Sequence, residues 1–164
     1  MQNSVAKMVQ LTARSKTYRL QLQSLVSIVQ FIKPRKYLEV GAYEGRSAFL
    51  FSVLAALQEQ APVIHLTSVD SWQGGDEHRE AGVAMGSVEG CYDAVIQECK
   101  PILSGSSVFE KIKGLSSDSL ASIRNRQNFY DLILVDAGHK AKDVLADMVH
   151  AWPLLRTGGI MILD

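Results

Sequence analysis

LEVGAYEGRSA, residues 38–48, is the stretch that decides the fold. It opens with a short apolar run that contains an acid, Glu39, and continues with two glycines, Gly41 and Gly45, before an apolar helical pattern begins. This order predicts a strand, a tight turn and a helix, an arrangement that often holds a nucleotide. Tyr43 stands where a dinucleotide-binding loop would have its second glycine, so the loop departs from that pattern.

The rest of the chain alternates between strand and helix patterns. Apolar residues recur with a helical period from Leu20 until Pro34, which predicts a helical segment within residues 1–33. Strands are expected at residues 36–40, 63–70, 107–114, 129–136 and 160–164. Helices are expected at residues 46–58, from 87 to 99, from 116 to 123, and along a stripe of Val144, Leu145, Met148, Val149 and Trp152. The polar, glycine-rich residues 71–86 are expected to form a loop.

This alternation predicts an α/β fold with a doubly wound, mostly parallel, Rossmann-like sheet and helices on both faces. Ligands of such sheets bind beyond the carboxyl ends of the strands. Polar residues collect at those ends in this sequence: Glu39 and Gly41, Asp70, Gly114 with Ser116, Asp136, and Asp164. One acid at a strand end is weak support for a site, but several on one edge of a sheet predict one.

Bulk composition narrows the classes of function. The 164 residues carry 17 basic and 17 acidic side chains, so the net charge gives no broad attraction to nucleic acid or to an anionic membrane. The longest apolar stretch, residues 48–57, is too short to span a bilayer, which needs about 20 residues. Cys91 and Cys99 lack metal-type spacing and are expected to be core thiols in a reducing compartment, so we expect a cytoplasmic protein.

The order of these strands, helices and polar strand ends resembles that of the class I S-adenosylmethionine-dependent methyltransferases, most closely the small-molecule O-methyltransferase-like branch. The resemblance rests on LEVGAYEGRSA, on SVDSW after it, and on YDLILVDAGHKAKDVLADMVHAWPLLRTGGIMILD, and it covers residues 34–164. It implies a sheet in the order 3-2-1-4-5, a methyltransferase domain over 34–164 behind the helical segment 1–33, and S-adenosylmethionine as cofactor.

The resemblance also assigns expected roles to residues. Gly41 and Gly45 belong to the motif that holds the amino acid part of the cofactor, and Asp70 matches the acid that binds ribose. The expected cofactor contacts are Glu39, Gly41, Ala42, Tyr43, Gly45, Ser47, Asp70, Ser71, Trp72, Ser116 and Asp136. Asp136 and His139 match the signature after the fourth strand, next to the transferred methyl group, and are the expected catalytic residues.

A metal is a further expectation. Asp136 and Asp164 end strands that are neighbours in the implied order, so their backbones should lie about 5 Å apart. Metal-dependent O-methyltransferases use such a pair for Mg²⁺, which would lower the pKa of the acceptor hydroxyl and orient it. His139 could instead act as the general base. His78, in the glycine-rich loop, is expected either on the substrate side or as a solvated surface residue.

The end of the sequence departs from the family. The family sheet normally has two further strands, so the resemblance predicts a sheet without its last two strands, either in a shortened chain or with a partner, such as a second copy, over the fifth strand. We expect a small-molecule acceptor and neither nucleic acid nor membrane as a partner. Two alternatives remain open: a nicotinamide-dependent oxidoreductase, and a truncated, non-catalytic binding domain.

Overall fold

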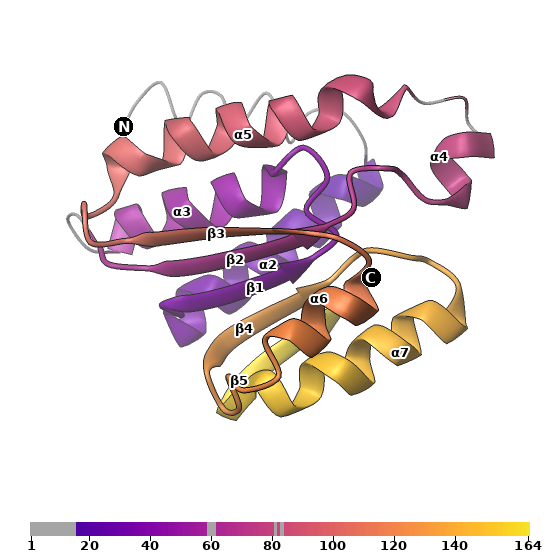
Figure 1. The fold of residues 1–164 in the computed structure, drawn as a ribbon. Helices are drawn as coiled ribbons and strands as arrows, with labels where there is room; N and C mark the ends of the chain where they lie inside the picture. The colour runs from indigo at the N-terminus through magenta and orange to yellow at the C-terminus, as the bar shows by residue number, and fades with distance from the viewer. Residues whose placement is uncertain (1–15, 59–61, 81, 83) are drawn as a thin grey trace.

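Five apolar segments pair side by side in the computed structural model, which describes residues 16–58, 62–80, 82 and 84–164 (Figure 1). The strands are β1 (Lys36–Val40), β2 (His65–Asp70), β3 (Val108–Lys113), β4 (Tyr130–Val135) and β5 (Leu155–Leu163). All four pairings are parallel, and the order is β3-β2-β1-β4-β5. The predicted fold class and strand order are therefore confirmed.

Helices cover both faces of this sheet. The α-helices are α2 (Lys16–Ile32), α3 (Arg46–Gln58), α4 (Asp76–Glu80), α5 (Val88–Cys99), α6 (Ser116–Ser122) and α7 (Ala141–Ala151), with short 3-10 turns at η1 (Met85–Ser87), η2 (Lys100–Ile102) and η3 (Trp152–Leu154). Helices α3 and α5 lie over one face, and α6 and α7 lie over the other (Figure 1). The five-residue α4 lies beyond the carboxyl ends of the strands (Figure 1).

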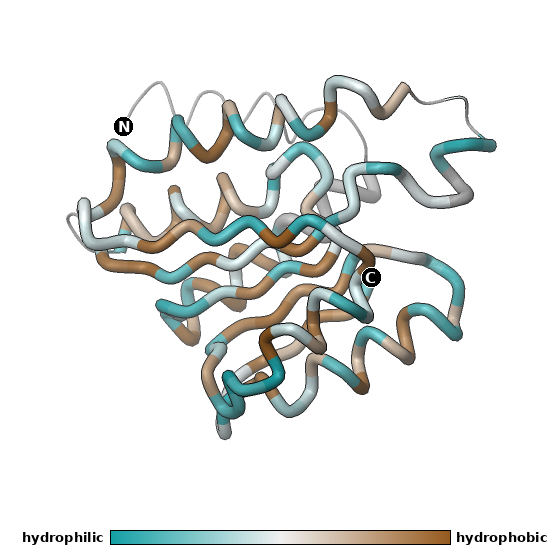
Figure 2. The backbone as a smooth tube through the Cα atoms, viewed as in Figure 1, coloured by the Kyte–Doolittle hydropathy of each residue, from teal (hydrophilic) through white to brown (hydrophobic). Residues whose placement is uncertain are grey.

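Side chains alternate between two hydrophobic cores because successive residues of a strand point to opposite faces. Tyr37 of β1 packs in the core beneath α3, whereas Leu38 and Val40 pack in the core beneath α6 and α7. The central strands accordingly carry hydrophobic residues interleaved with polar ones (Figure 2). This alternation places Glu39 on the same face as Tyr37, under α3.

Helix α3 is apolar on nearly all sides, and every residue from Ala48 to Ala55 is buried. Leu25 and Val29 of α2 belong to the same hydrophobic core, and α3 contacts both α2 and α5. A buried, all-round apolar helix is the pattern expected for an inner helix.

Two elements differ from the predicted ones. The expected loop 71–86 contains α4 and part of η1. The last strand is longer than the predicted 160–164, since β5 begins at Leu155 and includes Gly158 and Gly159, where its register with β4 shifts. Helix α7 ends at Ala151, before Pro153. Proline ends the helix because it has no amide hydrogen to donate.

The predicted apolar stripe of α7 is not its buried face. Leu145, Val149 and Trp152 are 56%, 59% and 64% exposed, whereas Asp147 and Ala151 are buried. Met148 is partly buried. The outer edge of β5 pairs with no other strand among the described residues. The prediction that a partner covers this edge stays a prediction.

Two further expectations concern cysteines and membranes. Cys99 is buried, but Cys91 is exposed, so the prediction that both lie in the core is wrong for Cys91. The buried face of α5 consists of Val88, Tyr92, Ile96 and Cys99, and Cys91 lies outside this face. Within the described part of the chain, no helix has both the length and the apolar character to cross a bilayer.

Candidate active site

The carboxyl ends of the strands meet at one edge, where backbone hydrogen bonds extend the sheet past its last paired residues. The amide of Gly41 donates to the carbonyl of Val69 over 2.8 Å, and the amide of Asp136 donates to that of Val40 over 2.7 Å. The amide of Gly114 donates to the carbonyl of Asp70 over 2.9 Å. The loops after β1 to β4 therefore start from one rigid platform.

Gly41 lies where the loops after β1 and β4 come closest. Its φ of +95° is in the region that favours glycine. A Cβ at this position would lie 2.7 Å from the Cα of Ala137 and would overlap the carbonyl group of Asp136. Because Gly41 has no side chain, the backbones of the loops after β1 and β4 can approach each other. Gly41 also lines the cavity described below.

Asp70 holds two neighbouring turns in place. One carboxylate oxygen accepts the amide hydrogen of Tyr43 over 2.8 Å, and the other accepts that of Trp72 over 2.6 Å. Tyr43 and Trp72 have φ values of 46° and 53°, which non-glycine residues rarely adopt. Hydrogen bonds to a carboxylate are among the stronger ones in proteins, so Asp70 stabilises both turned conformations.

Above this platform lies a cavity of about 470 Å³. Seven of the predicted site residues line it: Gly41, Tyr43, Asp70, Ser71, Ser116, Asp136 and His139. Its charged lining is acidic, since four aspartates and two histidines contribute to the wall and no lysine or arginine does among the residues described. The cavity is therefore suited to a neutral or cationic ligand.

Glu39 and Ser47 lie outside this cavity lining. The Glu39 carboxylate is fully buried and accepts hydrogen bonds from the hydroxyls of Ser47 and, over 2.5 Å, Ser68. It thereby joins β1 to β2 and to the first turn of α3. Burial raises the pKa of Glu39 to about 7, and the two serine hydrogen bonds oppose that rise.

Trp72, Ala42 and Gly45 also lie outside the lining. The Trp72 indole nitrogen donates to the carbonyl of Tyr43 over 2.9 Å, and its ring packs against Tyr92 with centroids 5.0 Å apart. The Lys111 ammonium lies 4.7 Å from the centre of the same ring. Trp72 therefore fixes the turn at Tyr43 from behind.

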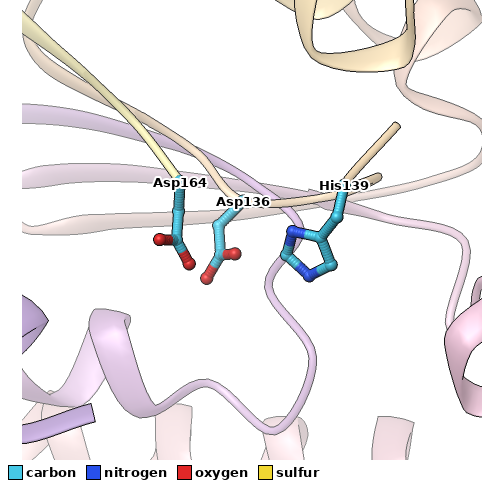
Figure 3. Close-up of side chains that lie close together, drawn as sticks. All are labelled: Asp136, His139 and Asp164. Carbon is cyan, nitrogen blue, oxygen red and sulfur yellow. The ribbon is translucent and has the colours of Figure 1, made fainter. Parts of the chain in front are cut away.

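Asp136, His139 and Asp164 come together at the ends of β4 and β5. Their side chains project to the same side of the strand ends (Figure 3), and one ligand atom from each lies within 4.8 Å of the other two. Burial, followed by repulsion from Asp164, holds the pKa of Asp136 well above its usual range. Two close carboxylates of this kind share a proton or bind a cation.

The opposite wall of the cavity comes from the segment that was expected to be a loop. His78 of α4 lines the cavity, and its ring centroid lies 5.1 Å from that of Tyr43. The amide of Gly75 donates to His78 Nδ1 over 3.3 Å, which assigns the neutral ring its proton on Nε2. The cavity-side interpretation of His78 is the one that matches this placement.

Two lining aspartates were not predicted from the sequence. Asp143 and Asp147 of α7 are one helical turn apart and both face the cavity. They were missed because the apolar stripe on the other side of α7 predicts that side as the buried face of the helix. Asp143, Asp147 and Ala151 follow one another at intervals of four residues, so they share one face of the helix. This spacing is the signal that could have identified the cavity-facing side of α7.

A family model described as a methyltransferase domain matches residues 38–164. No curated protein sequence matches the chain.

Solved structures share the fold at low identity. The O-methyltransferase TomG from Streptomyces achromogenes, in complex with SAM, is 18% identical with a TM-score of 0.63, over 98% of this chain and 64% of that one. An O-methyltransferase from Bacillus cereus in complex with SAH is 20% identical with a TM-score of 0.62, over 99% and 66%. The SAH-bound methyltransferase PaMTH1 of Podospora anserina is 17% identical with a TM-score of 0.60, over 98% and 61%.

The chain thus spans about two thirds or less of the length of these three proteins. Their identities are low enough that the likeness concerns the fold alone. The match to the family model, in contrast, includes every strand end that lines the cavity and most of the chain. This protein belongs to the methyltransferase domain family.

Proposed function

We propose that this protein transfers a methyl group from S-adenosylmethionine to a hydroxyl oxygen of a small molecule. The observation that carries the proposal is the acid-lined cavity over the carboxyl edge of the sheet, in a chain of the methyltransferase domain family. The cofactor is a cation without phosphate, and this cavity offers it carboxylates at the ends of β2 and β4.

The cofactor's parts are assigned to the wall as follows. Asp70 accepts hydrogen bonds from the ribose hydroxyls, because each of its oxygens keeps a lone pair after binding one backbone amide. Gly41 and Asp136 flank the amino acid part, and Ser116 borders the base. The nicotinamide-dependent alternative is not favoured, since the pyrophosphate of such a cofactor would face aspartates in a wall to which no described lysine or arginine contributes.

Chemically, the reaction is an in-line displacement. The acceptor oxygen forms a bond to the methyl carbon while the bond from carbon to sulfur breaks, and the cofactor leaves as neutral S-adenosylhomocysteine. His139 lies at the cavity beside Asp136 and accepts the proton of the acceptor hydroxyl. Most of the rate enhancement in such a site comes from positioning the two reactants.

A divalent cation fits the same place. Two carboxylates and an imidazole with ligand atoms within 4.8 Å of one another form an acceptable donor set for Mg²⁺ or Mn²⁺. Burial, and after it repulsion from Asp164, raises the pKa of Asp136, and a cation would offset both. We propose Asp136 and Asp164 as its ligands, with His139 as a third ligand in place of its role as the proton acceptor. When bound, the ion would lower the pKa of the acceptor hydroxyl. Calorimetric titration with Mg²⁺ of the wild type and of Asp164→Asn tests this assignment: equal or absent binding contradicts it.

Two broader assignments accompany this function. We propose a cytoplasmic location, which is supported by two free thiols, one exposed and one buried. We also propose that residues 34–164 form the methyltransferase domain, preceded by the segment 1–33, of which α2 is the described helix; residues 1–15 lie outside the described residues.

Calorimetry with S-adenosylhomocysteine tests the proposed function. The wild type should bind, and Asp70→Asn should bind roughly ten- to a hundred-fold more weakly, because a hydrogen bond to a charged group is worth about 1.5–3 kcal/mol. Asp118→Asn is the matched control, since Asp118 is exposed on α6 and outside the cavity lining. Absence of binding by the wild type would refute the function. Binding without methyl transfer to any hydroxyl acceptor in a broad screen would favour the non-catalytic alternative.

A further inference from the structure

Helix α7 carries a carboxylate in the wall of the cavity that the proposed reaction leaves without a role. Asp147 is only 3% exposed, yet it lines the cavity. Burial raises the pKa of Asp147 above its usual range, and a side-chain hydrogen bond with Ser116 opposes that rise. Burying a carboxylate is unfavourable unless several partners satisfy it.

The partners in view leave capacity for a ligand. An ionised carboxylate accepts hydrogen bonds at about four lone-pair positions and donates none. One serine hydroxyl occupies one of these positions. A group that occupies the cavity beside Asp147 should therefore present a donor to it.

The position of Asp147 along the sheet edge indicates which part of the ligand this is. Asp70 is paired with Lys113 in the β2–β3 register, and the amide of Gly114 donates to the carbonyl of Asp70 over 2.9 Å. Ser116 follows two residues later. The Ser116–Asp147 wall is thus the next feature along the edge from the acid that we assign to ribose, on the α6 and α7 side of the sheet.

With the ribose at Asp70, as proposed above, the base would lie toward this wall. The adenine base carries one exocyclic donor, the N6 amino group, and ring nitrogens that only accept. A carboxylate pairs with the amino group and repels an acceptor at the same place. The discrimination of a site that is built for a donor is strong, because the wrong ligand leaves a buried polar group unpaired.

We propose that Asp147 accepts a hydrogen bond from the N6 amino group of the cofactor and so selects adenosine over hypoxanthine nucleosides. The inference rests on the proposed function, which brings the nucleoside into this cavity. Asp147 is thereby a specificity-determining residue on α7, with Ser116 holding its carboxylate in position.

The test compares S-adenosylhomocysteine with S-inosylhomocysteine, in which a carbonyl oxygen replaces the amino group and the neighbouring N1 carries a hydrogen. Calorimetry on the wild type should give a preference for the adenosine compound of roughly ten- to a hundred-fold. In Asp147→Asn the carboxamide can donate to that carbonyl, so the preference should fall to near unity or invert. Asp118→Asn, on the exposed side of α6, should keep the wild-type preference.

Other outcomes overturn the proposal. A wild type that binds both compounds equally refutes it while leaving the proposed function intact, and so does an Asp147→Asn variant that binds both more weakly at an unchanged ratio, as a purely structural role would produce. Binding of neither compound refutes the proposed function as well. If the variant does not fold, the N6,N6-dimethyl analogue of S-adenosylhomocysteine replaces it, since both donors are then removed and wild-type affinity should fall by a similar factor.

Discussion

Replacing Glu39 with glutamine should remove a large part of the pH dependence of stability between about pH 5 and pH 8. The carboxyl group is fully buried, and burial raises its pKa from 4.5 to about 7. Between these two values the folded protein keeps the proton that the unfolded chain releases. Stability therefore falls as pH rises through this window and is constant above it.

The size of the effect follows from the shift. A rise from 4.5 to about 7 at roughly 1.4 kcal/mol per pH unit amounts to about 3 kcal/mol of stability lost between pH 5 and pH 8. Glutamine cannot ionise, and its amide still offers partners to Ser47 and Ser68. The free energy of unfolding of Glu39→Gln, taken relative to that of the wild type, should therefore be about 3 kcal/mol higher at pH 8 than at pH 5.

Urea unfolding followed by circular dichroism at pH 5, 6, 7 and 8 measures this difference. Other groups with shifted pKa values, such as Asp136, are present in both proteins and cancel in the comparison. Glu98→Gln is the control, because Glu98 is exposed on α5 and should follow the wild-type curve. Parallel curves for wild type and Glu39→Gln across the four pH values would refute the reasoning.

Two further predictions concern the platform and a polar network beneath the sheet. Gly41→Ala should destabilise the protein by more than about 3 kcal/mol in urea unfolding, because its Cβ would overlap backbone and its φ is +95°; Gly90→Ala, in open space on α5, should be neutral or slightly stabilising. Hydrogen bonds from Arg126 lower the pKa of Glu110 to about 2, so the stability that this carboxylate adds is present above about pH 4.5 and is lost as pH falls through 2. Arg126→Gln should flatten the stability profile in that acid range, and an unchanged slope there would show that the pair contributes nothing measurable.

The sheet and its ligand edge could be predicted from the sequence because strand ends carry a strong signal. Apolar runs that stop at Gly41, Asp70, Asp136 and Asp164 give the strand positions, and parallel topology brings such ends together. These signals are local in the chain, so no knowledge of packing is needed to find them.

The buried face of α7 could not be predicted in the same way. In α7, periodicity identifies an apolar face at Leu145 and Val149, but packing against α6 and the cavity buries Asp147 instead. Burial of an aspartate is acceptable only where a partner such as Ser116 is present, and that partner lies far away in the sequence. Tertiary contacts thus overrode a clear helical pattern.

Glu39 shows a different limit. The motif suggests a cofactor contact, but strand alternation puts Glu39 with Tyr37 under α3 while Val40 faces the cavity side. Its role in this geometry is to hold Ser47 and Ser68, and through them the turn that carries Tyr43. The pleat would have indicated this from the sequence, because side chains two residues apart share a face.

Stability and ligand binding are linked through the acids of this edge. Asp70, Asp136, Asp143 and Asp147 line one cavity whose described wall has no lysine or arginine to balance them, and burial raises the pKa of two of the four. Their mutual repulsion and desolvation destabilise the protein when no ligand is bound. A cation placed among them removes part of that penalty, which adds to its apparent affinity and stabilises the fold by mass action. An anionic or pyrophosphate-bearing ligand would increase the same penalty, so the charge of the cavity selects against it before any specific contact forms.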